Sequence, residues 1–174
     1  MLRKNGLVVG LVLVLVLAVP ADAHRADLIR AGKRVGPIKL YETTLRDARR
    51  WFGEPDERTV DERGCVKRVV RLLWRGELKV FAGRYKGETH PIAEVHVLDR
   101  SIISFEHGGL TIHTRRGIQV DEHQAKVRRA YPDARHETHR GHTHYIVEDP
   151  YDRVLVKVVD REVVALEARP FEWC

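Results

Sequence analysis

The sequence predicts an α+β fold: two tandem helix-plus-antiparallel-sheet repeats that form one sheet, with the helices on one face. Two stretches of the chain, residues 36–56 and 117–133, carry the same order of features: a short extended piece, a helix, an aromatic residue and a Pro-Asp stop. Each stretch is followed by runs in which apolar and polar residues alternate, a pattern typical of half-buried strands. The chain therefore divides into an N-terminal linker (24–35), repeat 1 (36–106) and repeat 2 (107–174), after a leader (1–23).

The leader has the pattern of a secretory signal peptide. Arg3 and Lys4 precede an apolar run over residues 6–20, and residues 21–23 form an A-x-A cleavage site. The run is short for a membrane helix, which needs about 20 apolar residues. We expect cleavage before His24, a secreted or extracytoplasmic chain, and no stable membrane anchor afterwards; an uncleaved anchor is the alternative.

Each repeat is expected to begin with one helix. Thr44 followed by Asp47 has the form of a capping box, and so does Asp121 followed by Gln124. Gly53 is expected to end the first helix and Pro132 the second.

Six strands are expected after these helices. They cover residues 66–74, 77–84 and 92–98 in repeat 1, and 143–148, 153–159 and 162–168 in repeat 2. Arg75-Gly76, Arg140-Gly141 and Asp160-Arg161 are expected to form turns, and Arg63-Gly64 another.

The charge pattern argues against a nucleic-acid partner. The chain has a formal net charge of +6, but its arginines stand beside acidic residues, as Arg49 does beside Asp47. A mixed, solvated surface is the simplest interpretation, because a nucleic-acid site needs like charges on one face with aromatics among them. An anionic envelope polymer or lipid head group remains as an alternative partner.

The two cysteines are expected to form one disulfide. Cys65 and Cys174 both lie in the exported part, and an even number of cysteines in an oxidising compartment favours pairing. Two unrelated free thiols are the alternative. The sequence has no C-x-x-C, so thiol redox catalysis is not expected.

No catalytic motif is present. Ser101 and Ser104 are the only serines, and neither lies in a G-x-S-x-G elbow. There is no H-E-x-x-H, P-loop or G-x-G-x-x-G. We therefore expect a protein that is not an enzyme, with a hydrolase of unrecognised site as a weaker alternative.

One cluster of histidines suggests a metal site. Its members are His136, His139, His142 and His144. If Arg140-Gly141 is a two-residue hairpin loop, His139 faces His142 and Glu137 faces His144, and these four side chains share one face. Such a group could bind Zn²⁺ or Cu²⁺. A solvated polar face, or a pH-sensitive protein contact, are the alternatives.

Short motifs resemble one known family. They are GPIKL at 36–40, FGEPD at 52–56, IHT at 112–114, GIQV at 117–120, YP at 131–132 and WC at 173–174. They resemble secreted bacterial proteins with the tandem fold of the β-lactamase inhibitory protein, whose single unit also occurs in small outer-membrane assembly lipoproteins. The resemblance covers roughly residues 36–174. No cysteine follows the cleavage site for lipidation, so the lipoprotein role does not fit.

The resemblance implies an exported binding or inhibitor-like module. Together with the lack of catalytic motifs, it predicts a non-catalytic protein that contacts another protein or an envelope component and has no cofactor. The alternative is an extracytoplasmic metal-binding protein that holds Zn or Cu at Glu137, His139, His142 and His144.

Overall fold

The computed structural model describes residues 28–30, 33–61, 69–83, 91–106, 108–148 and 152–170. The predicted leader, the Arg63-Gly64 turn and both cysteines, Cys65 and Cys174, lie outside these residues. In the described ranges, no helix is long and apolar enough to cross a bilayer.

The described residues form two short helices and many strands. The helices are α2 (Leu45–Phe52) and α3 (Gln124–Ala130). The strands are β1 (Ile29–Arg30), β2 (Arg34–Val35), β3 (Ile38–Lys39), β4 (Glu57–Asp61), β5 (Val69–Trp74), β6 (Leu78–Gly83), β7 (Ile92–Val97), β8 (Ile102–Ser104), β9 (Gly108–Leu110), β10 (Arg135–His139), β11 (His142–Glu148), β12 (Asp152–Val159) and β13 (Glu162–Pro170). β1 and β2 lie in the segment expected to be a linker.

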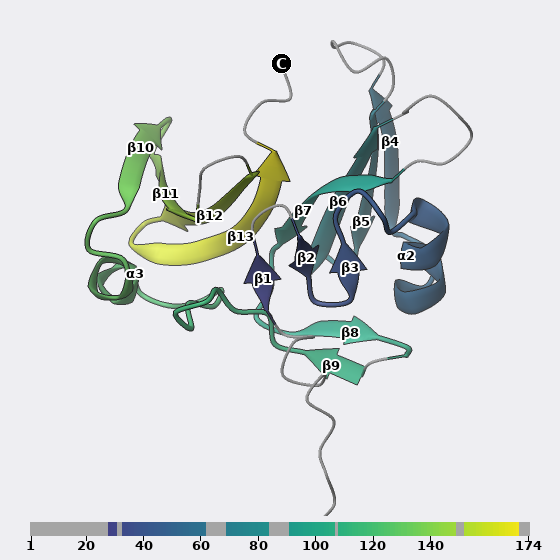
Figure 1. Ribbon diagram of the computed structural model, residues 1–174, viewed down its shortest axis with the longest axis horizontal. Helices are drawn as coiled ribbons and strands as arrows, with labels where there is room; N and C mark the ends of the chain where they lie inside the picture. Colours follow the sequence, from purple (N-terminus) through teal and green to yellow (C-terminus); the bar gives the residue numbers. More distant parts are fainter. Residues whose placement is uncertain are drawn as a thin grey trace, which may run out of the picture.

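One eight-stranded antiparallel sheet dominates the structure. Its strand order is β10-β11-β12-β13-β7-β6-β5-β4. β13 pairs with β7, so this contact joins strands from the two halves of the chain, with Leu166 opposite Val97 and Ala168 opposite Val95. In Figure 1 the sheet is curved, with β10 and β4 rising on either side of β13 and β7.

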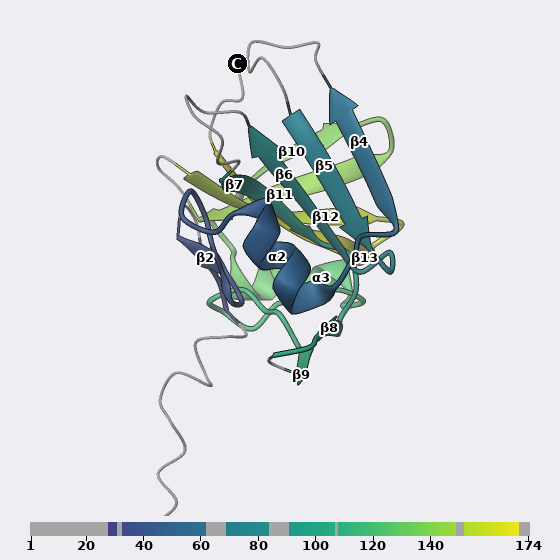
Figure 2. The ribbon, with the colours of Figure 1, turned by 90° about the vertical axis from the view of Figure 1, so that its right-hand side faces the viewer.

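One face of the sheet carries the core. Leu72, Val80, Val95, Ala168 and Val154 stand opposite one another on successive strands, and all five are fully buried. Along each strand, successive side chains point to alternate faces of the sheet. The residues directly before and after each member of this apolar row therefore lie on the opposite face. The core face is covered by β1–β3, β8–β9, the two helices and their connecting segments (Figures 1 and 2).

α2 begins and ends where its sequence predicts. Thr44 is the N-cap and forms the expected capping box with Asp47, and Gly53 is the C-cap. The hydrogen bond from Thr44 lowers the pKa of the Asp47 carboxyl, which suits a group at the positive end of a helix. Phe52 packs against Trp74 with ring centroids 5.8 Å apart, and Trp74 Nε1 donates to the Gly53 carbonyl oxygen at 2.9 Å. This ties the end of α2 to β5.

α3 begins later than predicted. The capping box of Asp121 and Gln124 is wrong, because His123 is the N-cap and accepts from the Ala125 amide. Asp121 lies in the preceding turn at φ 66°. Gln124 donates to the Tyr145 hydroxyl at 2.6 Å, which fastens the helix to β11.

The predicted fold class is wrong. The protein is mostly β, and it does not consist of tandem helix-plus-antiparallel-sheet repeats with helices on one face. The helices in the described residues span only eight and seven residues, too few to cover a sheet of eight strands. Short strands cover much of the core face instead. β1, β2, β8 and β9 form in segments where the sequence has no alternating strand pattern. The six predicted strands nevertheless all form, as β5, β6, β7, β11, β12 and β13, although Glu77 and Leu98 lie just outside β6 and β7.

Candidate functional site

The face of the sheet opposite the core is the candidate site, called here the open face. No helix or strand of the described residues lies against it (Figure 1). Its centre, on β5, β6, β7, β13, β12 and β11, is formed by Arg71, Leu73, Lys79, Phe81, Glu94, His96, Glu167, Arg169, Arg153, Leu155, Lys157, His142, His144 and Ile146. Polar and apolar side chains are thus mixed on one surface.

Glu167 is the most unusual residue of the open face. It is only 4% exposed, although it carries a carboxylate. A buried charge is costly unless it is paired, and Glu167 has partners on both sides. His144 Nε2 lies 3.6 Å from Glu167 Oε1, and His96 Nδ1 lies 3.9 Å from the same oxygen. Arg169 Nε lies 4.0 Å from the other oxygen.

These partners keep Glu167 ionised. Burial by itself raises the pKa of the carboxyl, but the hydrogen bond from His144 and the charges of His96, His144 and Arg169 outweigh it. The pKa of Glu167 is therefore lowered to about 2. The open face has a fixed negative charge at its floor, held by side chains from three strands.

A continuous line of contacts crosses the open face. The Arg71 guanidinium lies 5.3 Å from the Phe81 ring centroid, and the Phe81 and His96 rings are 4.9 Å apart. His96 Nε2 also contacts the Glu94 carboxylate. With Glu167 and His144, these residues link β5 to β11, and we call them the histidine band: Arg71, Phe81, Glu94, His96, Glu167 and His144.

The predicted histidine hairpin has the expected register. Arg140 and Gly141 form a two-residue turn at positive φ, and His139 pairs with His142 while Glu137 pairs with His144. These four residues share the open face. The His139 and His142 rings are 6.1 Å apart, and the His142 and His144 rings 5.1 Å apart. Desolvation lowers the pKa of His142, and the charges of Lys157 and His144 add to this.

The hairpin residues do not converge on one point. His144 is directed toward Glu167, away from His139 at the hairpin end. Within the described ranges, no group of three or more His, Cys, Asp or Glu side chains is arranged to hold a metal ion. Metal binding at Glu137, His139, His142 and His144 stays a prediction, and coordination through His144 Nε2 would break its contact with Glu167.

Two lysines of the open face have no counter-ion among the described residues. Lys79 stands opposite His96 on the neighbouring strand, and Lys157 stands opposite His144. Both lysines are half-buried. Neither has an ion-pair or hydrogen-bond partner among the described residues. Each histidine that holds Glu167 thus stands opposite a lysine that has no counter-ion in the described part of the chain.

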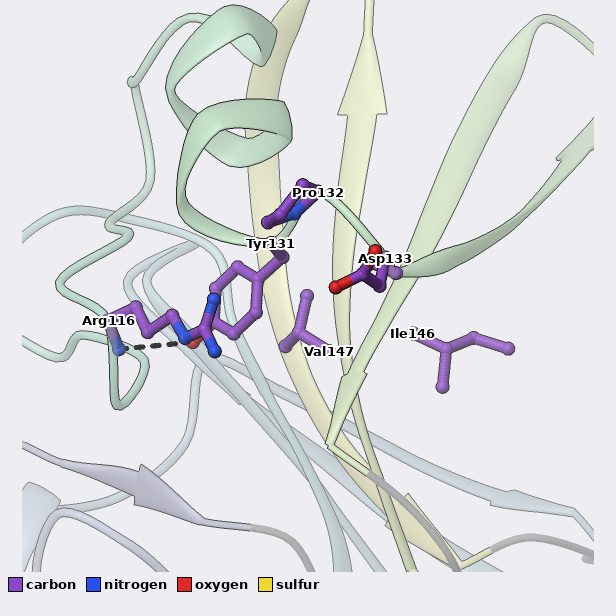
Figure 3. Close-up of a pocket in the computed structure, with 7 residues that line it drawn as sticks. Arg116, Tyr131, Pro132, Asp133, Ile146 and Val147 are labelled. Carbon is purple, nitrogen blue, oxygen red and sulfur yellow. Dashed lines mark hydrogen bonds between the residues drawn. The ribbon is translucent and has the colours of Figure 1, made fainter.

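A small pocket lies elsewhere, beside the end of α3. It has a volume of about 210 Å³, and Arg116, Tyr131, Asp133 and Val147 are among its lining residues (Figure 3). The Arg116 amide donates to the Tyr131 hydroxyl at 3.1 Å, and its guanidinium lies 5.1 Å from the Tyr131 ring centroid. These contacts hold the segment before α3 against the helix, so the polar groups of Arg116 serve the fold.

Sequence reasoning found the hairpin but missed the centre of the site. His96 and Glu167 are 71 positions apart, and no local spacing links them. The available signal was Glu167 itself, the one acidic residue in the otherwise apolar run 163–168. A buried carboxylate of this kind indicates a partner brought by the fold.

Comparison with known proteins shows little. No family model and no curated protein matches the chain. A solved structure of a DUF4309 family protein, YjgB, from Bacillus subtilis is similar at a TM-score of 0.48 and 13% sequence identity, and the match covers 85% of this chain and 90% of that chain. A likeness this weak carries no functional argument.

Proposed function

We propose that this protein is an exported, non-catalytic binding module that contacts another protein or a cell-envelope component through its open face. The N-terminal pattern of the sequence supports export, and the lack of catalytic motifs supports a binding role.

The observation that carries this proposal is the histidine band. Charged and aromatic side chains that line up across several strands cost free energy to arrange, because rotamers are fixed and charges desolvated. A sheet face that only met water would not need such order. Arginine and phenylalanine are also enriched at protein interfaces relative to the rest of the surface.

The composition of the open face supports the same conclusion. Leu73 and Phe81 are half-buried apolar side chains among charged ones, whereas Leu155 (1% exposed) and Ile146 (7%) are buried and add almost no surface. A mixture of apolar and charged groups of this kind is typical of a non-obligate interface, which is about as apolar as the rest of a protein surface.

Capture experiments with matched variants test the proposal. The mature protein, Phe81→Glu and Phe105→Glu are immobilised and exposed to envelope and culture fractions of the source organism. Phe81 lies on β6 in the open face, whereas Phe105 is 71% exposed and directly follows β8, one of the strands that cover the core face.

The proposal predicts that the same species is retained by the wild-type protein and by Phe105→Glu, and is lost with Phe81→Glu. Equal retention by all three baits, or loss with both variants, would contradict a role for the open face. Far-UV circular dichroism and thermal unfolding confirm that both variants are folded.

A further inference from the structure

We propose that the open face recognises an acidic protein surface, whose carboxylates pair with Lys79 and Lys157. This inference rests on the proposed function and names the chemistry of its partner.

The two lysines lie on either side of the Glu167 cluster. Lys79 lies opposite His96, and Lys157 lies opposite His144, so the two ammonium groups flank the Glu167 cluster from its two sides. Each lysine is a half-buried residue, and its ammonium group would gain a charge-assisted hydrogen bond from a carboxylate counter-ion. In the described part of the chain neither lysine has one. A partner's carboxylates would supply it.

Basic side chains outnumber acidic ones at the centre of the open face. Five basic side chains stand there: Arg71, Lys79, Arg153, Lys157 and Arg169. The described acidic side chains there, Glu94 and Glu167, already contact His96. The further acidic side chains of this face, Glu57, Asp61 and Glu137, lie on the edge strands β4 and β10. The centre is therefore positive, and complementary charge directs association.

The curved shape of the open face favours a protein partner over a lipid bilayer. His144 on β11 reaches Glu167 on β13 over the intervening strand β12, and Figure 1 shows the edge strands rising beside the centre. A convex protein surface can enter such a curved face. A flat bilayer would meet the edge strands first, and the lysines at the centre would stay out of its reach.

Binding of defined probes tests the inference. The probes are a fluorescent twelve-residue poly-glutamate peptide, the matching poly-glutamine peptide, inorganic polyphosphate, and vesicles containing phosphatidylglycerol. The proteins are the wild-type mature chain, Lys79→Met/Lys157→Met, and Lys33→Met/Lys39→Met. The control pair removes the same charge by the same substitutions, from the β1–β3 layer on the other side of the sheet. Affinity is measured by fluorescence anisotropy for the peptides, by calorimetry for polyphosphate and by co-sedimentation for the vesicles.

We expect poly-glutamate to bind the wild type at low salt and poly-glutamine not to bind. Lys79→Met/Lys157→Met should weaken poly-glutamate binding at least tenfold, and the control pair less than twofold. Equal losses in both double variants would show attraction by net charge alone and overturn the inference. Binding of polyphosphate or vesicles that depends on Lys79 and Lys157, without binding of poly-glutamate, would also overturn it.

Two features keep the test decisive. Should Lys79→Met/Lys157→Met fold poorly, Lys79→Gln and Lys157→Gln are measured singly, and each should weaken binding. Failure of the peptide test, with Phe81-dependent capture intact, would reject the acidic partner and leave the binding module standing. Loss of Phe81-dependent capture would reject the module itself.

Discussion

His144 and Glu167 contact each other across an intervening strand: His144 Nε2 on β11 lies 3.6 Å from Glu167 Oε1 on β13, and β12 runs between them. Neighbouring strands are about 4.8 Å apart, and β11 and β13 are separated by two such spacings. The two side chains therefore meet only by leaning toward each other over β12. The contact joins the histidine hairpin to the centre of the sheet.

The first prediction concerns the stability that Glu167 contributes and its loss at low pH. Its folded-state pKa of about 2 lies below the ordinary value of 4.5, so its contribution to stability is complete above pH 4.5 and is lost as the pH falls toward 2. The contribution is on the order of 3 kcal/mol. Urea unfolding should show Glu167→Gln less stable than wild type at pH 7, with the gap closing below pH 4.5.

Glu57→Gln is the control for this prediction, because Glu57 is exposed on the edge strand β4. It should change the free energy of unfolding by no more than about 0.5 kcal/mol at either pH. A gap between wild type and Glu167→Gln that stays constant from pH 7 to pH 3 would contradict the lowered pKa.

The second prediction concerns the end of α2. Gly53 lies at φ +83° and ψ −163°, a region open to glycine alone, and a Cβ there would stand 2.8 Å from the Phe105 ring. Gly53→Ala should lower the free energy of unfolding by about 2–4 kcal/mol. Adding Phe105→Ala should recover only the part due to the clash.

Gly141→Ala is the matched comparison, since Gly141 has φ +81° with no atom near its missing Cβ. It should cost about 1 kcal/mol. Equal losses in Gly53→Ala and Gly141→Ala, measured by urea unfolding, would show that the Phe105 contact adds no strain.

A third prediction follows from the lowered pKa of His142. Desolvation is its main cause and the charge of Lys157 the next. Lys157→Met should therefore raise the pKa of His142 partway toward 6.5, measured by an NMR titration of its ring protons. Lys79→Met, on the far side of the sheet centre, should leave it unchanged; an unchanged value in Lys157→Met would refute the assignment.

Zinc provides a fourth prediction. If the hairpin of Glu137, His139, His142 and His144 binds metal through Nε2 of His144, this nitrogen must first leave Glu167. Calorimetry at pH 7.5 should then show weak zinc binding in the wild type, tighter binding in Glu167→Gln and none in His139→Ala/His142→Ala. Absence of heat in Glu167→Gln would remove the metal hypothesis.

The sequence predicted local features well. The Arg140-Gly141 turn determined the register of its hairpin, and Thr44 with Asp47 determined where α2 begins, because in both cases neighbouring residues supply the whole signal. Asp121 failed as a cap because the preceding turn and its pairing with β13 move the N-cap to His123.

The long-range features of the fold could not be predicted from local sequence patterns. β1, β2, β8 and β9 are two or three residues long, too short for any periodicity, and their apolar residues pack into the core of the sheet. The pairing of β7 with β13 places His96 beside Glu167, and nothing in either strand alone identifies the other. The centre of the candidate site is thus a product of topology.

The central claim is that a partner sits on the open face, and site-specific photo-crosslinking tests it most directly. Benzoylphenylalanine replaces Phe81 on the open face in one protein and Phe105 beyond β8 in another. After irradiation in envelope and culture fractions, the account predicts one discrete crosslinked species from position 81 and none from position 105. The same species from both positions, or from position 105 alone, would contradict it.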